Sequence, residues 1–387
     1  MNGKASQHHP WFDIVRGVSA LLVCAGHLRA VLVVDFPGVD HPAQWHPVFY
    51  ALTGLGHQAV VVFFVLSGFF VGGAVLKPGF EARHYAVARL TRLWVVLIPC
   101  LLLTCWLDWI TRGLAPSILE GARQAQWHSG PEAGRYDASA RTFLGNVLFM
   151  QTVAVPVYGS NSPLWSLACE FWYYLLFPLL AVGLGWAAQG ATMLSRVGAL
   201  VAAVALLCWL PGELVRGFAV WLMGLLVWWG TSRSAPACLP LMAKRLMPLT
   251  TLLFLGALAC SKSAVWQTRL GVDADLLLGA AFALWCLSLA GPGPALTSAW
   301  GRWGRWLSDQ SYSLYLSHFP LLMFLAALWP DLTQQQPGWS VLFTFAVALM
   351  ALLAFGWGVW WLFERNTAQV RRWTTQAWAG LWNSIRV

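Results

Sequence analysis

The feature that most constrains this chain is a series of long apolar runs that continues from one end to the other. A helix needs about 20 apolar residues to cross the hydrocarbon core of a bilayer. Hydrophobic residues make up 58% of the chain and charged residues 10%, whereas soluble domains carry about 25% charged residues. We therefore predict an all-α fold, a polytopic membrane helix bundle with about ten transmembrane helices. The predicted spans are 12–34, 58–76, 91–110, 163–186, 197–211, 216–231, 247–261, 274–290, 311–330 and 340–363.

A further run at 142–157 is ambiguous, because it is apolar but contains Gly, Asn and Gln. Basic residues gather in the cytoplasmic segments of membrane proteins, so their distribution can decide whether it crosses. Without a crossing there, and with both ends cytoplasmic, fifteen Lys and Arg lie inside and eight outside. A crossing would move ten downstream basic residues outside and three inside. We predict that 142–157 is re-entrant or interfacial, that 1–11 and 365–387 are cytoplasmic, and that 1–387 forms one membrane-embedded domain.

The net charge of +9 fits cytoplasmic loops of a membrane protein better than a nucleic-acid surface. No polar segment interleaves basic residues with stacking aromatics, and we expect no nucleic-acid partner. The eight cysteines show no CxxC spacing, so we predict no metal site.

The first apolar run contains an arginine and a histidine, both of which are costly inside a bilayer. Arg16 and His27 are eleven residues apart, which places them on one face of a helix about 16 Å apart. Asp13 lies one turn before Arg16 and can pair with it. A structural interpretation is an Arg–Asp pair beside a packing histidine. The functional interpretation is that His27 exchanges a proton near neutral pH.

Two further spans begin with polar residues. Glu170 follows Trp165 and Ser166 at the start of one span. A carboxylate at this place can orient a histidine or bind a hydroxyl. The structural alternative is that it forms a hydrogen bond with the backbone or an ion pair with an arginine. His318 lies two turns after Ser311 on one helix face, as a functional group or as a packing residue.

Arg89 and Arg92 lie one turn apart at a predicted cytoplasmic membrane entrance. Two guanidinium groups on one helix face suit a phosphate or pyrophosphate. Ordinary positive-inside anchoring is the alternative.

These polar motifs form an ordered set that extends from residue 12 to about 365. They are Arg16-(ten residues)-His27, Phe63-Phe64-x-x-Ser67-Gly68, Arg89-x-x-Arg92, Trp165-Ser166-Leu167-x-x-Glu170 and Ser311-Tyr312-x-x-Tyr315-Leu316-x-His318. In this order and spacing the chain resembles the acyltransferase 3 family of bacterial membrane O-acyltransferases, without a fused esterase-like domain. It departs from many members at Val61 and Val62, where they have an acidic residue, and at Asn366, where they have proline after the Glu364–Arg365 pair.

The resemblance implies a transferase of the bacterial inner membrane. An acyl group, usually acetyl, would pass from cytoplasmic acyl-CoA to a hydroxyl of a glycan or a lipid-linked sugar. The rival interpretation is a proton-coupled transporter or flippase that relays protons through His27, Glu170 and His318. We find no pair of interrupted helices in the two halves of the chain, which such transporters often show.

The expected mechanism gives each motif a role. Arg89 and Arg92 would hold the phosphates of CoA, and Arg16 would act both in this site and in catalysis. His27 would act as general base on the acceptor hydroxyl or as a transient acyl carrier. Glu170 is the second expected catalytic residue and would orient His27 or bind the acceptor. Trp165 would stack on a sugar. The other supporting residues are Ser67, Gly68 and Tyr312, as candidate oxyanion donors, and Ser166 and His318.

Overall fold

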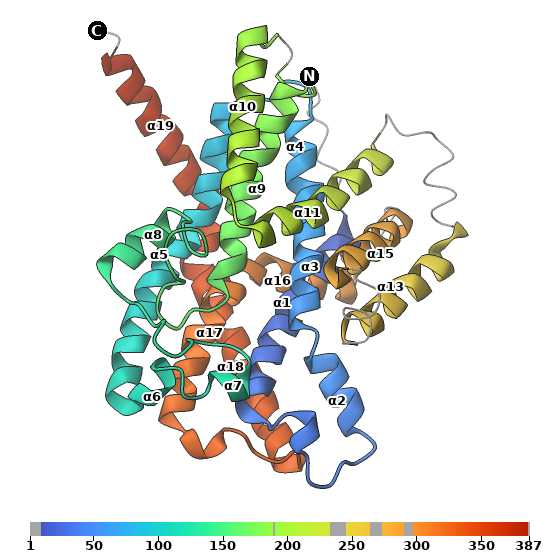
Figure 1. Ribbon diagram of the computed structural model, residues 1–387, viewed down its shortest axis with the longest axis vertical. Helices are drawn as coiled ribbons and strands as arrows, with labels where there is room; N and C mark the ends of the chain where they lie inside the picture. Colours follow the sequence, from blue (N-terminus) through green and yellow to red (C-terminus); the bar gives the residue numbers. More distant parts are fainter. Residues whose placement is uncertain (1–8, 189, 233–244, 264–272, 290–296, 386–387) are drawn as a thin grey trace. The chain divides into compact units, whose positions relative to one another are not determined.

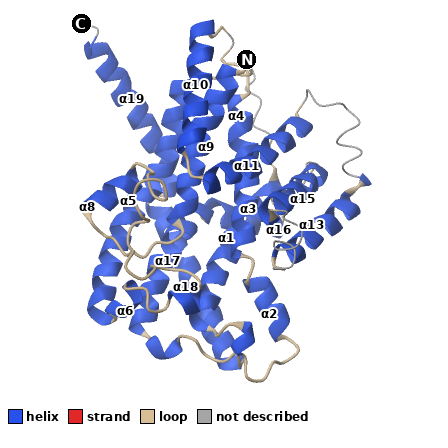
Figure 2. Cartoon of the chain, in the orientation of Figure 1, coloured by secondary structure: helices blue, strands red, loops and turns tan. Residues whose placement is uncertain are grey.

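The computed structural model describes residues 9–188, 190–232, 245–263, 273–289 and 297–385, with side chains through 376. The molecule is 77% helical, and the described residues contain no β-strand (Figures 1 and 2). The predicted cytoplasmic segment 1–11 lies largely outside the described residues. The helical fold class predicted from the apolar runs is confirmed.

Seven helices in the described residues are long and apolar enough to cross a membrane, and three shorter ones are also apolar. Each of the ten predicted spans corresponds to one of them. Five of the long segments are single helices: α1 (Pro10–Leu32), α5 (Ala82–Leu114), α9 (Leu164–Gly183), α11 (Gly212–Thr231) and α17 (Ser311–Leu328). The sixth joins α2 (His46–Thr53), α3 (Gly56–Ser67), the π-helical η2 (Gly68–Gly72) and α4 (Gly73–Val75). The seventh joins α18 (Trp339–Leu362), η4 (Glu364–Asn366) and the first part of α19 (Thr367–Ile385). The shorter apolar helices are α10 (Met193–Trp209), α13 (Met247–Ser261) and α15 (Ala274–Leu289). The remaining elements are η1 (Phe36–Gly38), α6 (Pro116–Leu119), α7 (Gln124–Trp127), α8 (Ala140–Val147), α16 (Ala299–Asp309) and η3 (Pro330–Leu332).

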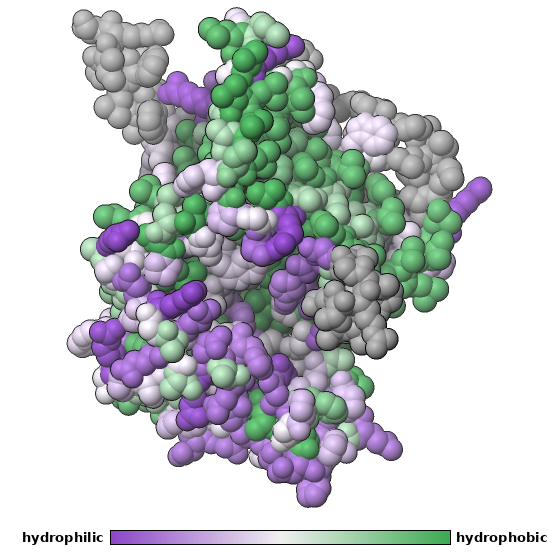
Figure 3. Space-filling view, viewed as in Figure 1, coloured by the Kyte–Doolittle hydropathy of each residue, from purple (hydrophilic) through white to green (hydrophobic). Residues whose placement is uncertain are grey.

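Large apolar side chains on α10 are exposed, as expected for a surface that faces lipid. Met193, Leu194 and Val201 are 76%, 84% and 63% exposed, and Figure 3 shows a hydrophobic surface over this helix. An apolar stripe of this size would be a liability in water. Over the loop that contains α6 and α7, Figure 3 shows mainly polar side chains.

The ambiguous run at 142–157 does not form a spanning helix. Its helix α8 has eight residues, about 12 Å of rise, against a hydrocarbon core of about 30 Å. Asn146 and Gln151 are fully buried. The Asn146 amide donates to the carbonyl of Pro156 and accepts from the Tyr158 N–H, and the Gln151 amide donates to the carbonyl of Leu164. These side chains satisfy an irregular backbone within the protein, as predicted for this segment.

The chain divides into two compact units that alternate along the sequence. The first contains Met1–Ser19, His57–Phe80 and Tyr173–Asp309, and the second contains Ala20–Gly56, Glu81–Trp172 and Gln310–Val387. The prediction of one membrane-embedded domain over 1–387 stays a prediction.

In the first unit, η2 packs directly on α11. A Cβ added to Gly68 would overlap the carbonyl oxygen of Trp221, and a Cβ added to Gly224 would overlap that of Val65. The backbones can approach this closely because neither glycine has a side chain. Trp221 is fully buried beside this crossing.

We expect Gly68→Ala to destabilise the protein, because the added methyl group would force η2 and α11 apart. Overpacking of this kind costs about 1–3 kcal/mol. The measurement is thermal unfolding of the purified protein in detergent micelles. The matched control is Gly358→Ala in α18, where an added Cβ meets nothing within 4 Å. An equal unfolding temperature for the two variants would contradict the close-packing account.

In the second unit, α17 packs against both α5 and α18, and α19 packs against α5. The core of this unit therefore surrounds α17, on which His318 is 1% exposed and Phe319 is fully buried. Asn161 joins two of these helices, because its amide donates to the Leu316 carbonyl of α17 and to the Thr104 hydroxyl of α5.

Candidate active site

His27 and His318, which are 291 residues apart in the chain, form a hydrogen-bonded pair between α1 and α17 in the second unit. Nδ1 of His27 lies 2.9 Å from Nε2 of His318. The two rings are nearly parallel, with an interplanar angle of 12° and centroids 5.2 Å apart. The ring of Phe319 meets the His27 ring edge-on, with centroids 4.9 Å apart.

The hydrogen bonds fix which nitrogen of each ring carries a proton. Nδ1 of His318 lies 2.9 Å from the carbonyl oxygen of Leu314, which can only accept, so this nitrogen donates. In the neutral ring, Nε2 of His318 then has a lone pair and accepts from Nδ1–H of His27. Nε2 of His27 therefore has a lone pair that takes no part in the hydrogen bond between the two histidines. An imidazole held in one tautomer by a second group is the arrangement of a general base.

The two histidines differ in accessibility. His27 is partly exposed, whereas His318 is 1% exposed. His27 is thus the more accessible member of the pair, and its Nδ1 lies against the buried ring of His318.

Residues of the Trp165–Glu170 motif on α9 approach the same helix α17. The Ser166 hydroxyl lies 2.7 Å from the Tyr315 hydroxyl, and the ring centroids of Tyr315 and His318 are 6.1 Å apart. Glu170 lies within electrostatic range of Tyr312 and Tyr315. The sequence offered Glu170 as a residue that could orient His27, but His318 holds that place on Nδ1.

Arg16 lies in a local network of the first unit. Its Nε donates to the Ser308 hydroxyl at 2.8 Å, its Nη2 lies 3.6 Å from the Asp13 carboxylate, and Ser308 donates to Asp13 at 3.1 Å. The predicted Asp13–Arg16 pair is confirmed. Gly17 allows this contact, because a Cβ there would overlap Leu307 of α16.

Arg92 forms an ion pair that the sequence did not predict. Its Nη1 lies 2.8 Å from Oε1 of Glu364, whose side chain is 1% exposed while that of Arg92 is 38% exposed. Oε2 of Glu364 accepts from the backbone N–H of Ser313 at 3.1 Å and from its hydroxyl at 2.6 Å. Glu364 therefore caps the first turn of α17, where backbone N–H groups have no helical partner. Arg92 also lies over the ring of Tyr312, 5.6 Å from its centroid.

Arg89 lies over the ring of Tyr85 on the preceding turn of α5, with 5.6 Å between its guanidinium carbon and the ring centroid. Tyr312, one of the candidate oxyanion donors, donates its hydroxyl proton to the Leu93 carbonyl at 3.0 Å. That bond satisfies its donor within the bundle.

Ser67 and Gly68, the other candidate oxyanion donors, have packing roles in the first unit. The Ser67 hydroxyl accepts from the Trp221 indole N–H at 3.1 Å and lies 3.3 Å from the Tyr174 hydroxyl. Gly68 provides the close helix crossing described above. The Phe-Phe-x-x-Ser-Gly motif thus has a structural explanation in how α3 and η2 pack on α11.

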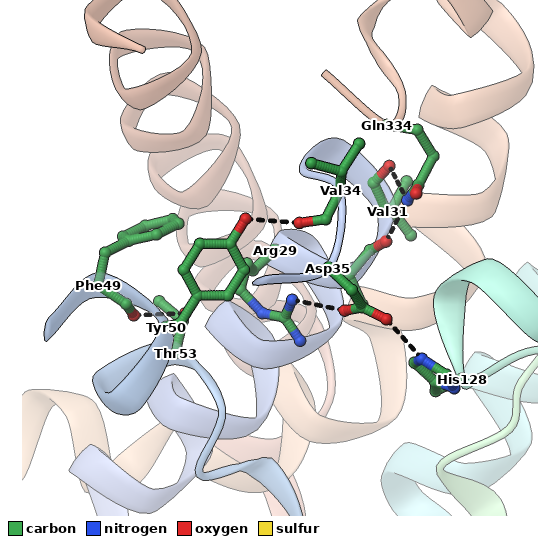
Figure 4. Close-up of polar contacts among 10 residues, drawn as sticks. Arg29, Val31, Val34, Asp35, Phe49, Tyr50, Thr53, His128 and Gln334 are labelled. Atoms are coloured by element: carbon green, nitrogen blue, oxygen red, sulfur yellow. Dashed lines mark hydrogen bonds and ion pairs between the residues drawn. The ribbon is translucent and has the colours of Figure 1, made fainter. Parts of the chain in front are cut away.

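A polar cluster that the sequence did not predict lies just beyond His27 (Figure 4). Nη1 of Arg29 donates to Asp35 at 3.1 Å, and its guanidinium lies over Tyr50, 5.2 Å from the ring centroid. Nε2 of His128 lies 2.6 Å from the other Asp35 oxygen. Burial raises the pKa of Asp35, but the hydrogen bonds from His128 and Arg29 outweigh this and hold that pKa below its usual value. The cluster joins the loop after α1 to α2 and to the end of α7.

A second missed cluster holds the loop before α9. Asp108 of α5 is 1% exposed and accepts from the Ser160 N–H at 2.8 Å, the Ser160 hydroxyl at 2.6 Å and the Tyr136 hydroxyl at 3.2 Å. Gly159 permits this approach: it has a φ of 58°, and a Cβ there would overlap the carboxylate. A carboxylate inside an apolar helix was the signal in the sequence that could have found it.

The fold and the site together define a polytopic helical membrane protein with a hydrogen-bonded histidine dyad, in which one ring is buried and the other partly exposed. A family model described as an acyltransferase domain, Acyl_transf_3, matches residues 9–361 of the 387. The chain therefore belongs to the acyltransferase 3 family and is a multi-pass membrane acyltransferase. No curated protein and no solved structure matches it.

Proposed function

We propose that this acyltransferase moves an acyl group, acetyl in the first instance, from acyl-CoA to a hydroxyl of a glycan or a lipid-linked sugar. The observation that carries the proposal is the His27–His318 dyad, in which a partly exposed imidazole is held in the tautomer that leaves Nε2 able to accept a proton. Acyl transfer to an alcohol needs such a base, because a hydroxyl is a weak nucleophile at neutral pH.

In the proposed reaction, Nε2 of His27 takes the proton of the acceptor hydroxyl as its oxygen attacks the thioester carbonyl. The C–S bond then breaks, and the CoA sulfur leaves and takes the proton from His27. The imidazolium that forms in between is stabilised by donating Nδ1–H to His318. Direct transfer of this kind needs no acyl-histidine intermediate.

The charge distribution supports a cytoplasmic origin for the donor. We place the chain in the bacterial inner membrane with both termini cytoplasmic, because that orientation puts most Lys and Arg inside. Arg89 and Arg92 then lie at the cytoplasmic mouth of α5, where they would bind CoA phosphates. Glu170 and Trp165 would bind the acceptor.

The phosphate role predicts a defect specific to acyl-CoA. Arg92→Ala is a poor test, because it would leave the buried Glu364 carboxylate without its cation, which is strongly destabilising. We therefore expect Arg89→Gln combined with Arg92→Lys to raise the KM for acyl-CoA about tenfold or more while the KM for the acceptor changes little, because the lysine retains the charge beside Glu364 but not the guanidinium fork. Steady-state kinetics in purified membranes measures both constants. An unchanged KM for acyl-CoA would contradict the phosphate role.

The activity itself is tested by mixing the purified protein in proteoliposomes with acyl-CoA esters and glycan or lipid-linked sugar fractions. We expect free CoA thiol and acylated acceptor to appear in equal amounts, with acetyl-CoA the best donor, and mass spectrometry of the acceptor to show the added acyl mass. Uptake of substrate without thiol release would instead support the transporter interpretation.

A further inference from the structure

An apolar groove runs along α5 beside the start of α19, and neither histidine of the dyad lines it. Its volume is about 730 Å³, and most of its wall is hydrocarbon. Its apolar lining includes Val87, Leu90, Trp94, Val95, Ile98 and Pro99 of α5. Figure 1 shows the first turns of α19 next to the first turns of α5.

One end of the groove is basic. A second cavity of about 420 Å³ adjoins it at Val87, which lines both, and its lining includes His84, Arg371 and Arg372. Arg83 lines the apolar groove at the same end. Among the residues that the structure describes, no carboxylate lines either cavity, although Glu81 pairs with His84 at 2.7 Å. The groove thus joins an apolar trough to a cationic pocket.

The dimensions fit one leaflet of a bilayer. From Val87 to Pro99 the helix rises about 18 Å, slightly more than half of a hydrocarbon core of about 30 Å. A basic cluster next to a membrane helix attracts anionic lipid headgroups. An acyl chain that starts at this cluster would lie along the groove toward the middle of the membrane.

We propose that the groove between α5 and α19 binds an anionic phospholipid, with its phosphate on Arg83, Arg371 and Arg372 and one acyl chain against Val95 and Ile98. The charge and the hydrocarbon walls are both needed. A water-soluble phosphate would use only the basic end, and a neutral lipid would use only the trough. This site is separate from the histidine dyad and does not rest on the proposed acceptor or donor.

The headgroup half of the proposal is tested by native mass spectrometry of the full chain from micelles doped with phosphatidylglycerol or phosphatidylcholine. We expect the wild-type protein to retain phosphatidylglycerol preferentially. Arg371→Ala and Arg372→Ala should each weaken its binding about fivefold, and together on the order of twentyfold. The matched control is Arg365→Ala, because Arg365 lies on the same C-terminal segment but stacks on Trp361, 4.2 Å from its ring centroid, outside both cavities. Equal retention of the two lipids, or equal binding by the double variant and the control, would overturn the proposal.

The acyl-chain half is tested by filling the groove. Ile98→Trp should lower phosphatidylglycerol binding severalfold because the larger ring occupies the trough. Leu102→Trp, one turn further along α5, is the control, since Leu102 is 58% exposed and does not line the groove. The comparison requires that the two variant proteins unfold at the same temperature, so that a difference in lipid binding does not reflect a difference in stability. A photoactivatable anionic lipid should crosslink to α5 and α19 peptides in the Leu102→Trp protein and lose those crosslinks in the Ile98→Trp protein. Crosslinks that persist unchanged in the Ile98→Trp protein, or that map to other helices, would overturn the site.

Discussion

Replacing His27 with alanine is expected to lower kcat for acyl transfer by about 10²- to 10⁴-fold, the range that a positioned general base contributes. The change removes Nε2, the accessible proton acceptor of the dyad, and leaves the His318 ring buried against Leu314. The measurement is acceptor-dependent release of CoA thiol from acyl-CoA in proteoliposomes. Because acyl-CoA is expected to bind elsewhere, at Arg89 and Arg92, its KM should change little.

The control for His27 is His41→Ala. His41 is exposed in the loop after α1, so its loss should leave the rate unchanged. Unfolding temperatures of both proteins show whether the bundle is intact. A folded His27→Ala protein that makes product at the wild-type rate would sink the proposed mechanism.

Replacing His318 separates orientation from packing. His318→Leu removes the acceptor for Nδ1–H of His27 and leaves that ring free to adopt the other tautomer, so we expect kcat to fall on the order of 10²- to 10³-fold. His318→Gln keeps an acceptor oxygen on a side chain of similar length and should retain part of that activity. In both variants the KM for acyl-CoA should stay near its wild-type value.

The comparison of these two His318 variants decides the role. Equal losses in the glutamine and leucine proteins would show that the imidazole ring itself is required, and would contradict the view that His318 acts as a hydrogen-bond acceptor. A loss seen in KM for acyl-CoA rather than in kcat would place His318 in donor binding instead.

The helices of this protein could be predicted well because each span is a continuous apolar run, including the three that form the shorter helices. The run at 142–157 needed a second argument from the charge distribution. Its buried Asn146 and Gln151 then turned out to be the groups that satisfy an irregular backbone. Residue spacing also predicted the Asp13–Arg16 pair, because a contact one turn apart depends only on helix geometry.

The contacts between distant helices could not be predicted. Helical phase placed His27 on a face of α1, but nothing in the chain said that His318, 291 residues away, would meet it. Glu170 was the more conventional partner for a histidine, and the packing of α17 on its neighbours brought His318 to Nδ1 instead. The pairing of Arg92 with Glu364 could not be predicted either, because it also joins segments that are far apart in the sequence.

One helix was missed although its pattern was readable. In α16, Gly301, Gly304, Leu307 and Ser308 are buried, while Trp300, Trp303 and Trp306 are 70%, 40% and 42% exposed. Small residues three apart with tryptophan and arginine between them predict an amphipathic helix that lies in a membrane interface. The segment of 11 residues is too short to cross a bilayer, so a search for spans passes over it.

The contacts of the buried Glu364 carboxylate also predict which positions change together during evolution. It contacts an arginine of α5 and the first turn of α17, so a change at any of these positions alone leaves a charge or a donor without its partner. Positions 92, 313 and 364 are therefore expected to co-vary among relatives, with loss of the acid accompanied by loss of the guanidinium. Such linked substitutions would mark lineages in which the helix that carries His318 is anchored in a different way.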